Sequence, residues 1–218
     1  MSFDRIAPWY GPMEGFLAGG CMHRARLWLM EGNHVPAKVL MVGEGPGRFL
    51  KAFRIRFPDA EMTVVDASAR MLEIARRRLG DHRGVTFVHA RVEDWDTDQR
   101  FDLIVTNFLL DCLPQRGVEE TVAKLGGLTM PNAEWWIADF NLPEGVAAGW
   151  RSRVILRLLY LFFGNVAGVQ ARDLHPPDAA LEQAGLIRIA RMTWSWGLLK
   201  GERWRKEVGG KWIASRKS

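Results

Sequence analysis

The stretch Val39-Leu40-Met41-Val42-Gly43-Glu44-Gly45-Pro46-Gly47-Arg48-Phe49-Leu50 decides the fold of this chain. It reads as a short buried strand, a turn dense in glycine and the first residues of a helix. A second apolar run, Met62-Thr63-Val64-Val65, ends in Asp66, 19 residues after Gly47. Strand, glycine turn, helix, strand and acid follow one another in the order typical of a nucleotide-cofactor site.

The spacing of the glycines argues against two familiar phosphate-binding loops. Gly43, Gly45 and Gly47 form a G-x-G-x-G run, whereas the dinucleotide fingerprint G-x-G-x-x-G would place its third glycine at Arg48. Arg48 also stands where a G-x-x-x-x-G-K-[ST] loop needs its second glycine. An NAD(P)-dependent oxidoreductase is therefore the less favoured interpretation. Glycine carries no Cβ, so the turn can still approach a ligand closely, and the acid at 66 can accept hydrogen bonds from two ribose hydroxyls.

Size and composition are those of an ordinary globular protein. The chain has 218 residues, of which 48% are hydrophobic, so a single domain with a sizeable core is expected. Its two cysteines, Cys21 and Cys112, are too few for a disulfide framework and are interpreted as reduced. The first residues, Met1-Ser2-Phe3-Asp4-Arg5, lack the apolar segment of a signal peptide. The sequence therefore predicts a cytoplasmic protein.

The net charge of +5 leaves more than one interpretation open. It could attract nucleic acid, anionic lipid or an acidic substrate, or it could be a modest excess on a solvated surface. The second is favoured, because no nucleic-acid-binding motif accompanies the basic residues. The apolar run at 154–163 is interrupted by Arg157 and is too short to span a bilayer. A buried helix covering the site is favoured there over a helix on a membrane surface. A homodimer is left open.

Strand and helix patterns alternate along most of the chain. Periodicity predicts strands at 38–42, 61–65, 85–89, 101–106 and 133–139, and helices at 24–30, 47–57, 68–79, 117–125 and 179–184. Two final strands are expected at 186–196 and 203–214, with a turn near Lys200-Gly201. This alternation predicts an α/β fold with a parallel sheet. Most of the tryptophans in the last strands are expected to pack in the core or on the sheet, namely Trp135, Trp136, Trp194, Trp196, Trp204 and Trp212.

Four successive segments resemble the class I S-adenosylmethionine (SAM)-dependent methyltransferases of the small-molecule type. They are Val39 to Gly47, Val64 to Ser68 followed by Met71, Ala90 to Trp95, and Phe101 to Phe108, within residues 38–140. The resemblance implies a Rossmann-like three-layer sandwich around a mostly parallel seven-stranded sheet of order 3-2-1-4-5-7-6. It further implies one domain over 1–218, with an N-terminal cap or lid at 1–34, a SAM-binding core at 35–140, an acceptor-shaping helical insertion at 141–185 and C-terminal strands at 186–218.

The same resemblance implies which residues hold SAM and its product, S-adenosylhomocysteine. The acid at 66 would bind the ribose and Met71 would pack on the adenine. The full set of expected contacts is Gly43, Glu44, Gly45, Gly47, Asp66, Ala67, Met71, Val92, Glu93 and Asn107.

Two positions depart from the family pattern. Met41 stands where the family usually has an acid, so Glu44 is a substitute candidate for contacting the methionine end of SAM. Stabilisation of the following helix by Glu44 is the equally weighted alternative. Arg91 stands where an aspartate often binds the adenine amino group. Adenine recognition is therefore expected from the backbone N–H of Val92, from Glu93 or from Asp94.

Methyl transfer from a sulfonium needs alignment of the acceptor, exclusion of water and often removal of a proton. It needs no metal, and the sequence has no H-x-x-x-H or C-x-x-C spacing. Asn107-Phe108-Leu109-Leu110 differs from the Asn-Pro-Pro-[Tyr/Phe] of family members that methylate amino groups on bases and glutamine. A small, apolar or aromatic acceptor methylated on oxygen or carbon is therefore expected. Candidates for removing its proton or orienting it are Asp111, Asp139, His175 and Tyr10. A SAM-fold protein that binds without turnover is the alternative.

Overall fold

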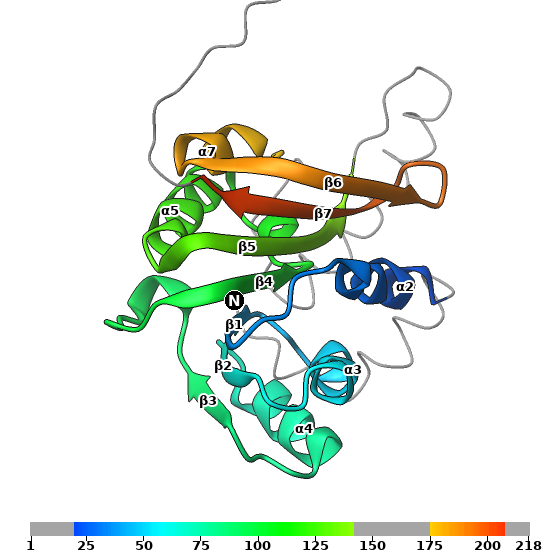
Figure 1. Ribbon diagram of the computed structural model, residues 1–218, viewed down its shortest axis with the longest axis vertical. Coiled ribbons are helices and arrows are strands. Elements are labelled where there is room, and N and C mark those ends of the chain that lie inside the picture. The colour runs from blue at the N-terminus through cyan, green and yellow to red at the C-terminus, as the bar shows by residue number, and fades with distance from the viewer. Residues whose placement is uncertain (1–19, 142–174, 208–218) are drawn as a thin grey trace, which may run out of the picture.

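A seven-stranded sheet forms the middle of the molecule in the computed structural model, which describes residues 20–141 and 175–207 (Figure 1). Its strand order is β3-β2-β1-β4-β5-β7-β6. The strands are β1 (Lys38–Val42), β2 (Glu61–Asp66), β3 (Val85–His89), β4 (Phe101–Asn107), β5 (Thr129–Phe140), β6 (Leu186–Trp194) and β7 (Leu199–Lys206). Strands β3 to β5 pair in parallel, while β7 runs antiparallel to both β5 and β6. The expected order and the mostly parallel pairing are confirmed.

Helices cover both faces of this sheet. They are α2 (Cys21–Trp28), α3 (Arg48–Arg56), α4 (Ala69–Leu79), α5 (Gln115–Gly126) and α7 (Asp178–Gln183). Three short 3-10 turns, η1 (Leu29–Glu31), η2 (Val92–Asp94) and η3 (Leu110–Cys112), complete the described elements. None of the helices in this part of the chain is long and apolar enough to cross a membrane.

The strand alternation of β1 builds two separate cores. Because successive side chains of a strand point to opposite faces, Val39 and Met41 enter one cluster while Leu40 and Val42 enter the other. All four are at most 4% exposed, as expected for a central parallel strand with helices on both sides. The continuous apolar run at 39–42 is therefore explained by burial on both faces.

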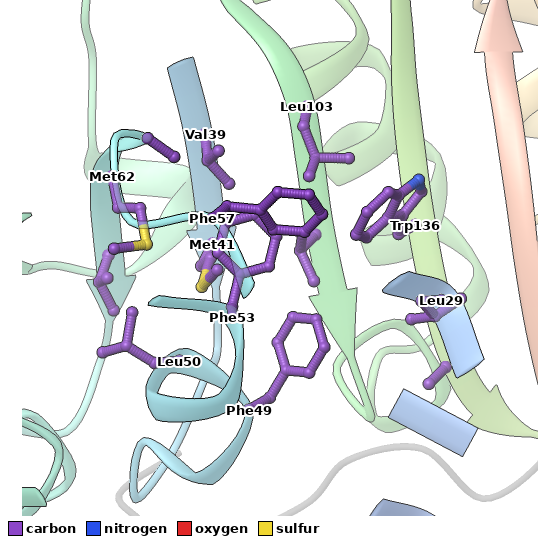
Figure 2. Close-up of a cluster of buried hydrophobic side chains, with 14 of the residues drawn as sticks. Leu29, Val39, Met41, Phe49, Leu50, Phe53, Phe57, Met62, Leu103 and Trp136 are labelled. Atoms are coloured by element: carbon purple, nitrogen blue, oxygen red, sulfur yellow. The ribbon is translucent and has the colours of Figure 1, made fainter. Parts of the chain in front are cut away.

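The first cluster, shown in Figure 2, lies between the sheet and helices α2, α3 and α4. Phe49, Leu50 and Phe53 on one side of α3 are fully buried, as expected for the apolar face of an amphipathic helix. Trp136 of β5 packs against Phe53 and Phe57 at ring-centroid distances of 6.1 and 6.3 Å. The second cluster packs α5 and α7 against the opposite face, with Trp135 and Trp204 at its centre.

The ends of α4 follow the sequence rules closely. Ser68 is the N-cap, and its side chain accepts a hydrogen bond from the N–H of Met71 at 3.1 Å. Gly80 ends the helix with a positive φ of 78°. This helix was predicted to the residue, because both caps are local.

The predicted turn near Lys200-Gly201 is wrong. The chain turns at residues 195–198, where Ser195, Trp196 and Gly197 all have positive φ, and β7 begins at Leu199. Gly201 lies inside β7. A side chain is excluded there because a Cβ would meet the ring of Trp28 at 3.0 Å and that of Trp194 at 3.2 Å. Its glycine provides close packing rather than a turn.

Trp196 is 91% exposed at this turn, so it is not one of the tryptophans that pack in the core or on the sheet. Tyr10, the apolar run at 154–163 with Arg157, and Trp212 lie outside the described residues. The division of the chain into one domain with four parts stays a prediction.

Candidate functional site

The carboxyl edge of the sheet gathers most of the predicted functional residues. Parallel strands end on the same side, so the turn after β1, Asp66 at the end of β2, Asn107 at the end of β4 and Asp139 near the end of β5 lie along one edge. Lys200 joins them from the antiparallel β7, where it pairs in register with Asp139. In a sheet of this kind, ligands bind outside this edge.

The glycine turn has a conformation that only glycine adopts easily. Gly43, Gly45 and Gly47 have φ values of 68°, 66° and 76°. A Cβ on Gly43 would meet the side chain of Leu109 at 3.0 Å, and one on Gly47 would meet Ala75 at 2.7 Å. A Cβ on Gly45 would meet nothing within 4 Å, so this glycine borders open space. Two of the glycines therefore serve packing, and the middle one leaves the backbone open to a ligand.

Asp66 ties this turn to the second strand. Its Oδ2 accepts a hydrogen bond from the N–H of Gly45 at 3.0 Å, and its Oδ1 accepts one from the N–H of Ser68 at 2.9 Å. The N–H of Gly43 adds a bond to the Val65 carbonyl at 2.9 Å. A carboxylate can accept about four hydrogen bonds, which is the chemistry that a pair of ribose hydroxyls requires. The predicted pairing of glycine turn and acid is thus present in space.

Glu44 is buried and its carboxylate faces the start of α3. Its Oε1 accepts a hydrogen bond from the N–H of Leu50 at 2.9 Å. Burial raises the pKa of Glu44 to about 7, although the Leu50 N–H and the charge of Arg26 act to lower it. This geometry matches the alternative in which Glu44 stabilises the helix N-terminus. A contact to the methionine end of SAM stays a prediction.

The Glu44→Gln variant is expected to flatten the dependence of stability on pH. The pKa of the folded protein, about 7, is above the ordinary 4.5, so between these values the folded state binds more protons than the unfolded state. This carboxyl therefore costs stability progressively as pH rises from about 4.5 to about 7, by about 3 kcal/mol in total. Urea unfolding across this range measures it. A difference between wild type and variant that does not change with pH would contradict the prediction.

The expected adenine side of the site is assembled but partly occupied by internal contacts. Met71 is buried at the start of α4, and Val92 is buried in η2. The Glu93 carboxylate forms an ion pair with Arg91 at 2.9 Å, on a surface where both side chains are about half exposed. The carbonyl of Ala67 lies 3.2 Å from a ring nitrogen of His89. Arg91, which departs from the family pattern, therefore pairs with Glu93. The adenine contacts expected of Glu93, Asp94 or the Val92 N–H stay predictions.

Asn107 ends β4 with an amide that is unsatisfied within the described residues. It is 5% exposed, and neither its Oδ1 nor its Nδ2 has a hydrogen-bond partner there. Such a buried amide is costly unless a ligand or water completes it. Phe108 follows with a φ of 54°, a strained value for a residue with a side chain. The guanidinium of Arg26, from α2, lies 4.8 Å over the Phe108 ring.

Three of the four predicted acceptor-side residues line one small cavity. Asp111, Asp139 and His175 surround a volume of about 50 Å³ together with Lys200, and Phe140, Asn141, Pro176 and Pro177 complete its wall. Asp111 comes from η3 and accepts a long hydrogen bond of 3.4 Å from the N–H of Phe140. Tyr10, the fourth candidate, lies outside the described residues. The cavity lies beside the carboxyl edge, at β4, β5 and β7.

The two aspartates of this cavity hold their protons more tightly than usual. Burial raises the pKa of Asp111 to about 6, and the Phe140 N–H and Lys200 lower it only in part. Burial also raises the pKa of Asp139 well above its ordinary value, and the nearby charge of Asp111 raises it further. Asp111 is thus able to exchange a proton at a pH not far below neutral.

Sequence reasoning missed Lys200, Glu202 and Arg26. The Lys200 ammonium is 4% exposed and donates to Glu202 Oε2 at 3.1 Å, while Glu202 is fully buried. Lys200 and Glu202 were missed because the turn was expected at Lys200-Gly201. Their place on either side of Gly201 becomes informative only when β7 is known to begin at Leu199. Arg26 lay in an unremarkable helix, and no local signal marks its guanidinium as buried.

Comparisons with known proteins identify a methyltransferase domain in this chain. Residues 39–132 match the model of a methyltransferase domain. The malonyl-[acyl-carrier protein] O-methyltransferase of Anoxybacillus flavithermus is 35% identical over 92 residues, 42% of this chain and 34% of that protein. The trans-aconitate 2-methyltransferase of Methylobacterium radiotolerans is 32% identical over 112 residues, 51% of this chain and 40% of that protein. The chain thus spans less than half the length of the curated relatives it matches.

The fold itself recurs in solved structures. The N-methyltransferase NodS of Bradyrhizobium japonicum, solved in complex with S-adenosyl-L-homocysteine, aligns with a TM-score of 0.65 over 87% of each chain. Sequence identity is 15%, so this likeness concerns the fold alone.

Proposed function

We propose that this chain, which contains the core of a class I S-adenosylmethionine-dependent methyltransferase domain, transfers a methyl group from SAM to a small acceptor. The observation that carries the proposal is the 3.0 Å hydrogen bond that the Gly45 N–H, in the glycine turn, donates to the Asp66 carboxylate at the end of β2. This bond holds an open stretch of backbone beside a carboxylate at the edge of a parallel sheet.

The residues present suit the two polar ends of SAM. The Asp66 carboxylate would accept hydrogen bonds from the ribose hydroxyls. The backbone at Gly45, with no neighbour within 4 Å of its missing Cβ, would let the ligand approach. Asn107 has an unsatisfied amide at the end of the neighbouring central strand, where the methionine portion would complete its hydrogen bonds. Met71 would pack on the adenine.

SAM supplies an activated methyl group, because its sulfur is positively charged. The protein's part is to align the acceptor with the methyl carbon and to keep water out. Where the acceptor is a hydroxyl, its oxygen forms the new bond to carbon as the sulfur–carbon bond breaks, and sulfur keeps the electron pair of that bond. The acceptor proton would pass to an ionised carboxylate among Asp111 and Asp139, with His175, which also lines the cavity, as the further candidate base.

The lining of the small cavity supports one class of acceptor. Its polar lining is a group of titratable side chains, and Phe140 provides an apolar surface. This suits a small molecule with one polar group on an apolar or aromatic body, methylated on oxygen or carbon. The malonyl-[acyl-carrier protein] enzyme among the relatives supports a protein-linked acceptor as the second candidate. A cytoplasmic location and a homodimer stay predictions.

Calorimetry with SAM, S-adenosylhomocysteine and NADH tests the cofactor. Binding of the first two in the micromolar range (about −8 kcal/mol) and no binding of NADH is expected. Tight binding of NADH alone would restore the oxidoreductase interpretation. Release of S-adenosylhomocysteine in the presence of an acceptor library then separates an enzyme from a protein that only binds the cofactor.

A further inference from the structure

The cavity beside the carboxyl edge has an unusual balance of charge. Two buried carboxylates, Asp111 and Asp139, face it, and Lys200 is the buried cation of its wall. The ammonium of Lys200 is already bound by Glu202 at 3.1 Å and lies 3.7 Å from Asp178. Glu202 is fully buried, but Arg188 and Arg191 share its carboxylate at 3.2 and 3.5 Å, so one ammonium faces the two carboxylates of the cavity.

Asp139 gives an independent sign of a ligand. Its side chain is 2% exposed, and neither carboxylate oxygen has a hydrogen-bond partner within the described residues. An ionisable group held in this way is costly to fold, since burying an unsatisfied carboxylate forfeits the hydrogen bonds it would make in water. A group that donates hydrogen bonds from the cavity would remove that cost, whereas a second carboxylate there would add repulsion.

We propose that this cavity receives the polar group of the methyl acceptor, a hydroxyl or an amine that donates a hydrogen bond, and rejects an acceptor that presents a carboxylate there. The inference rests on the proposed function, because it assigns the cavity to the acceptor of that reaction. The proposed acceptor differs from the malonyl and trans-aconitate groups in the names of the relatives, because those groups carry carboxylates. Phe140 on the cavity wall would contact the apolar body of the acceptor.

Burial raises the pKa of both aspartates, and the charge of Asp111 raises that of Asp139 further, whereas the Lys200 ammonium lowers both. The unpartnered oxygens of Asp139 accept the hydrogen bond of the ligand. His175 lies on the α7 side of the cavity and Lys200 on the β7 side.

Paired fragments of one shape test the proposal. Benzyl alcohol, benzylamine and benzoate are titrated into the full chain, with and without S-adenosylhomocysteine, and binding is followed by saturation-transfer NMR. The alcohol and the amine are expected to bind at least about tenfold more tightly than benzoate. Benzoate binding as tightly as the alcohol, or no binding by any fragment, overturns the proposal.

Two variants locate the effect. Asp139→Asn keeps the shape, cannot ionise and replaces one accepting oxygen by a donating amide group, so the preference against benzoate is expected to fall by about tenfold or more. Asp102→Asn is the matched control at the opposite edge of the sheet, where Asp102 accepts from two backbone N–H groups. It is expected to leave the preference unchanged, and an equal change in both variants would overturn the assignment to the cavity.

The outcome is separate from that of the proposed function. Loss of S-adenosylhomocysteine binding would remove the cofactor, yet the fragment preference would still be measured in the absence of nucleoside. Normal cofactor binding together with a preference for benzoate would overturn the acceptor class alone.

Discussion

Substitution of Gly47 by alanine is expected to destabilise the protein by about 2–5 kcal/mol. Gly47 has a φ of 76°, where a residue with a Cβ loses about 1–2 kcal/mol. A Cβ at this position would also lie 2.7 Å from Cα and 2.8 Å from Cβ of Ala75, on the neighbouring helix α4. These are backbone and rigid atoms, and overpacking of this kind costs about 1–3 kcal/mol more. Since small domains are stable by about 5–15 kcal/mol, the fraction lost is large.

Urea unfolding followed by circular dichroism measures this loss, and Gly20→Ala is the matched control. Gly20 is also in the left-handed α conformation, with a φ of 79°, but a Cβ there would meet nothing within 4 Å. Its variant is expected to lose only the conformational part, about 1–2 kcal/mol. Equal losses in the two variants would show that the contact between α3 and α4 is not what requires glycine at 47.

Replacement of Asp66 by asparagine is expected to weaken binding of S-adenosylhomocysteine by about 100-fold or more. The variant removes the negative charge that would accept from the ribose hydroxyls, and hydrogen bonds to a charged group contribute about 1.5–3 kcal/mol each. An amide also has one oxygen, so it cannot accept from both Gly45 and Ser68, whose N–H groups now bond to the two carboxylate oxygens. The loop that borders the cofactor would therefore be less fixed. Calorimetric titration measures the affinity.

Asp102→Asn again serves as the control, because the two carboxylates are alike in their contacts. Asp102 accepts from the N–H groups of Ala37 and Lys38 at 2.8 and 3.0 Å, but at the amino end of β1 and β4. This variant is expected to lose stability without losing affinity for the nucleoside. Unchanged affinity in Asp66→Asn, with an intact fold, would contradict the assigned role of the acid.

The sequence was sufficient for the core of the fold because the signals there are local. The strand predicted at 38–42 and the helix predicted at 68–79 are both found, as β1 and α4. A continuous apolar run indicates a strand buried on both faces, and the capping residues lie next to the helix in the sequence. The joining of glycine turn and acid could be predicted because a parallel crossover returns the second strand beside the first. The β7 turn was misplaced because Gly201 provides close packing for two tryptophan rings that lie far away in sequence.

What the sequence determined by itself is therefore the parallel half of the sheet and its glycine turn, together with the acid expected to hold the cofactor. Only the tertiary structure decided the other half of the site. Asp111, Asp139, His175 and Lys200 come from four separate segments, and they meet because β7 inserts antiparallel between β5 and β6 and brings its first residues to the carboxyl edge. No local pattern encodes that meeting, since the burial and mutual charge of these groups exist only after the strands have paired.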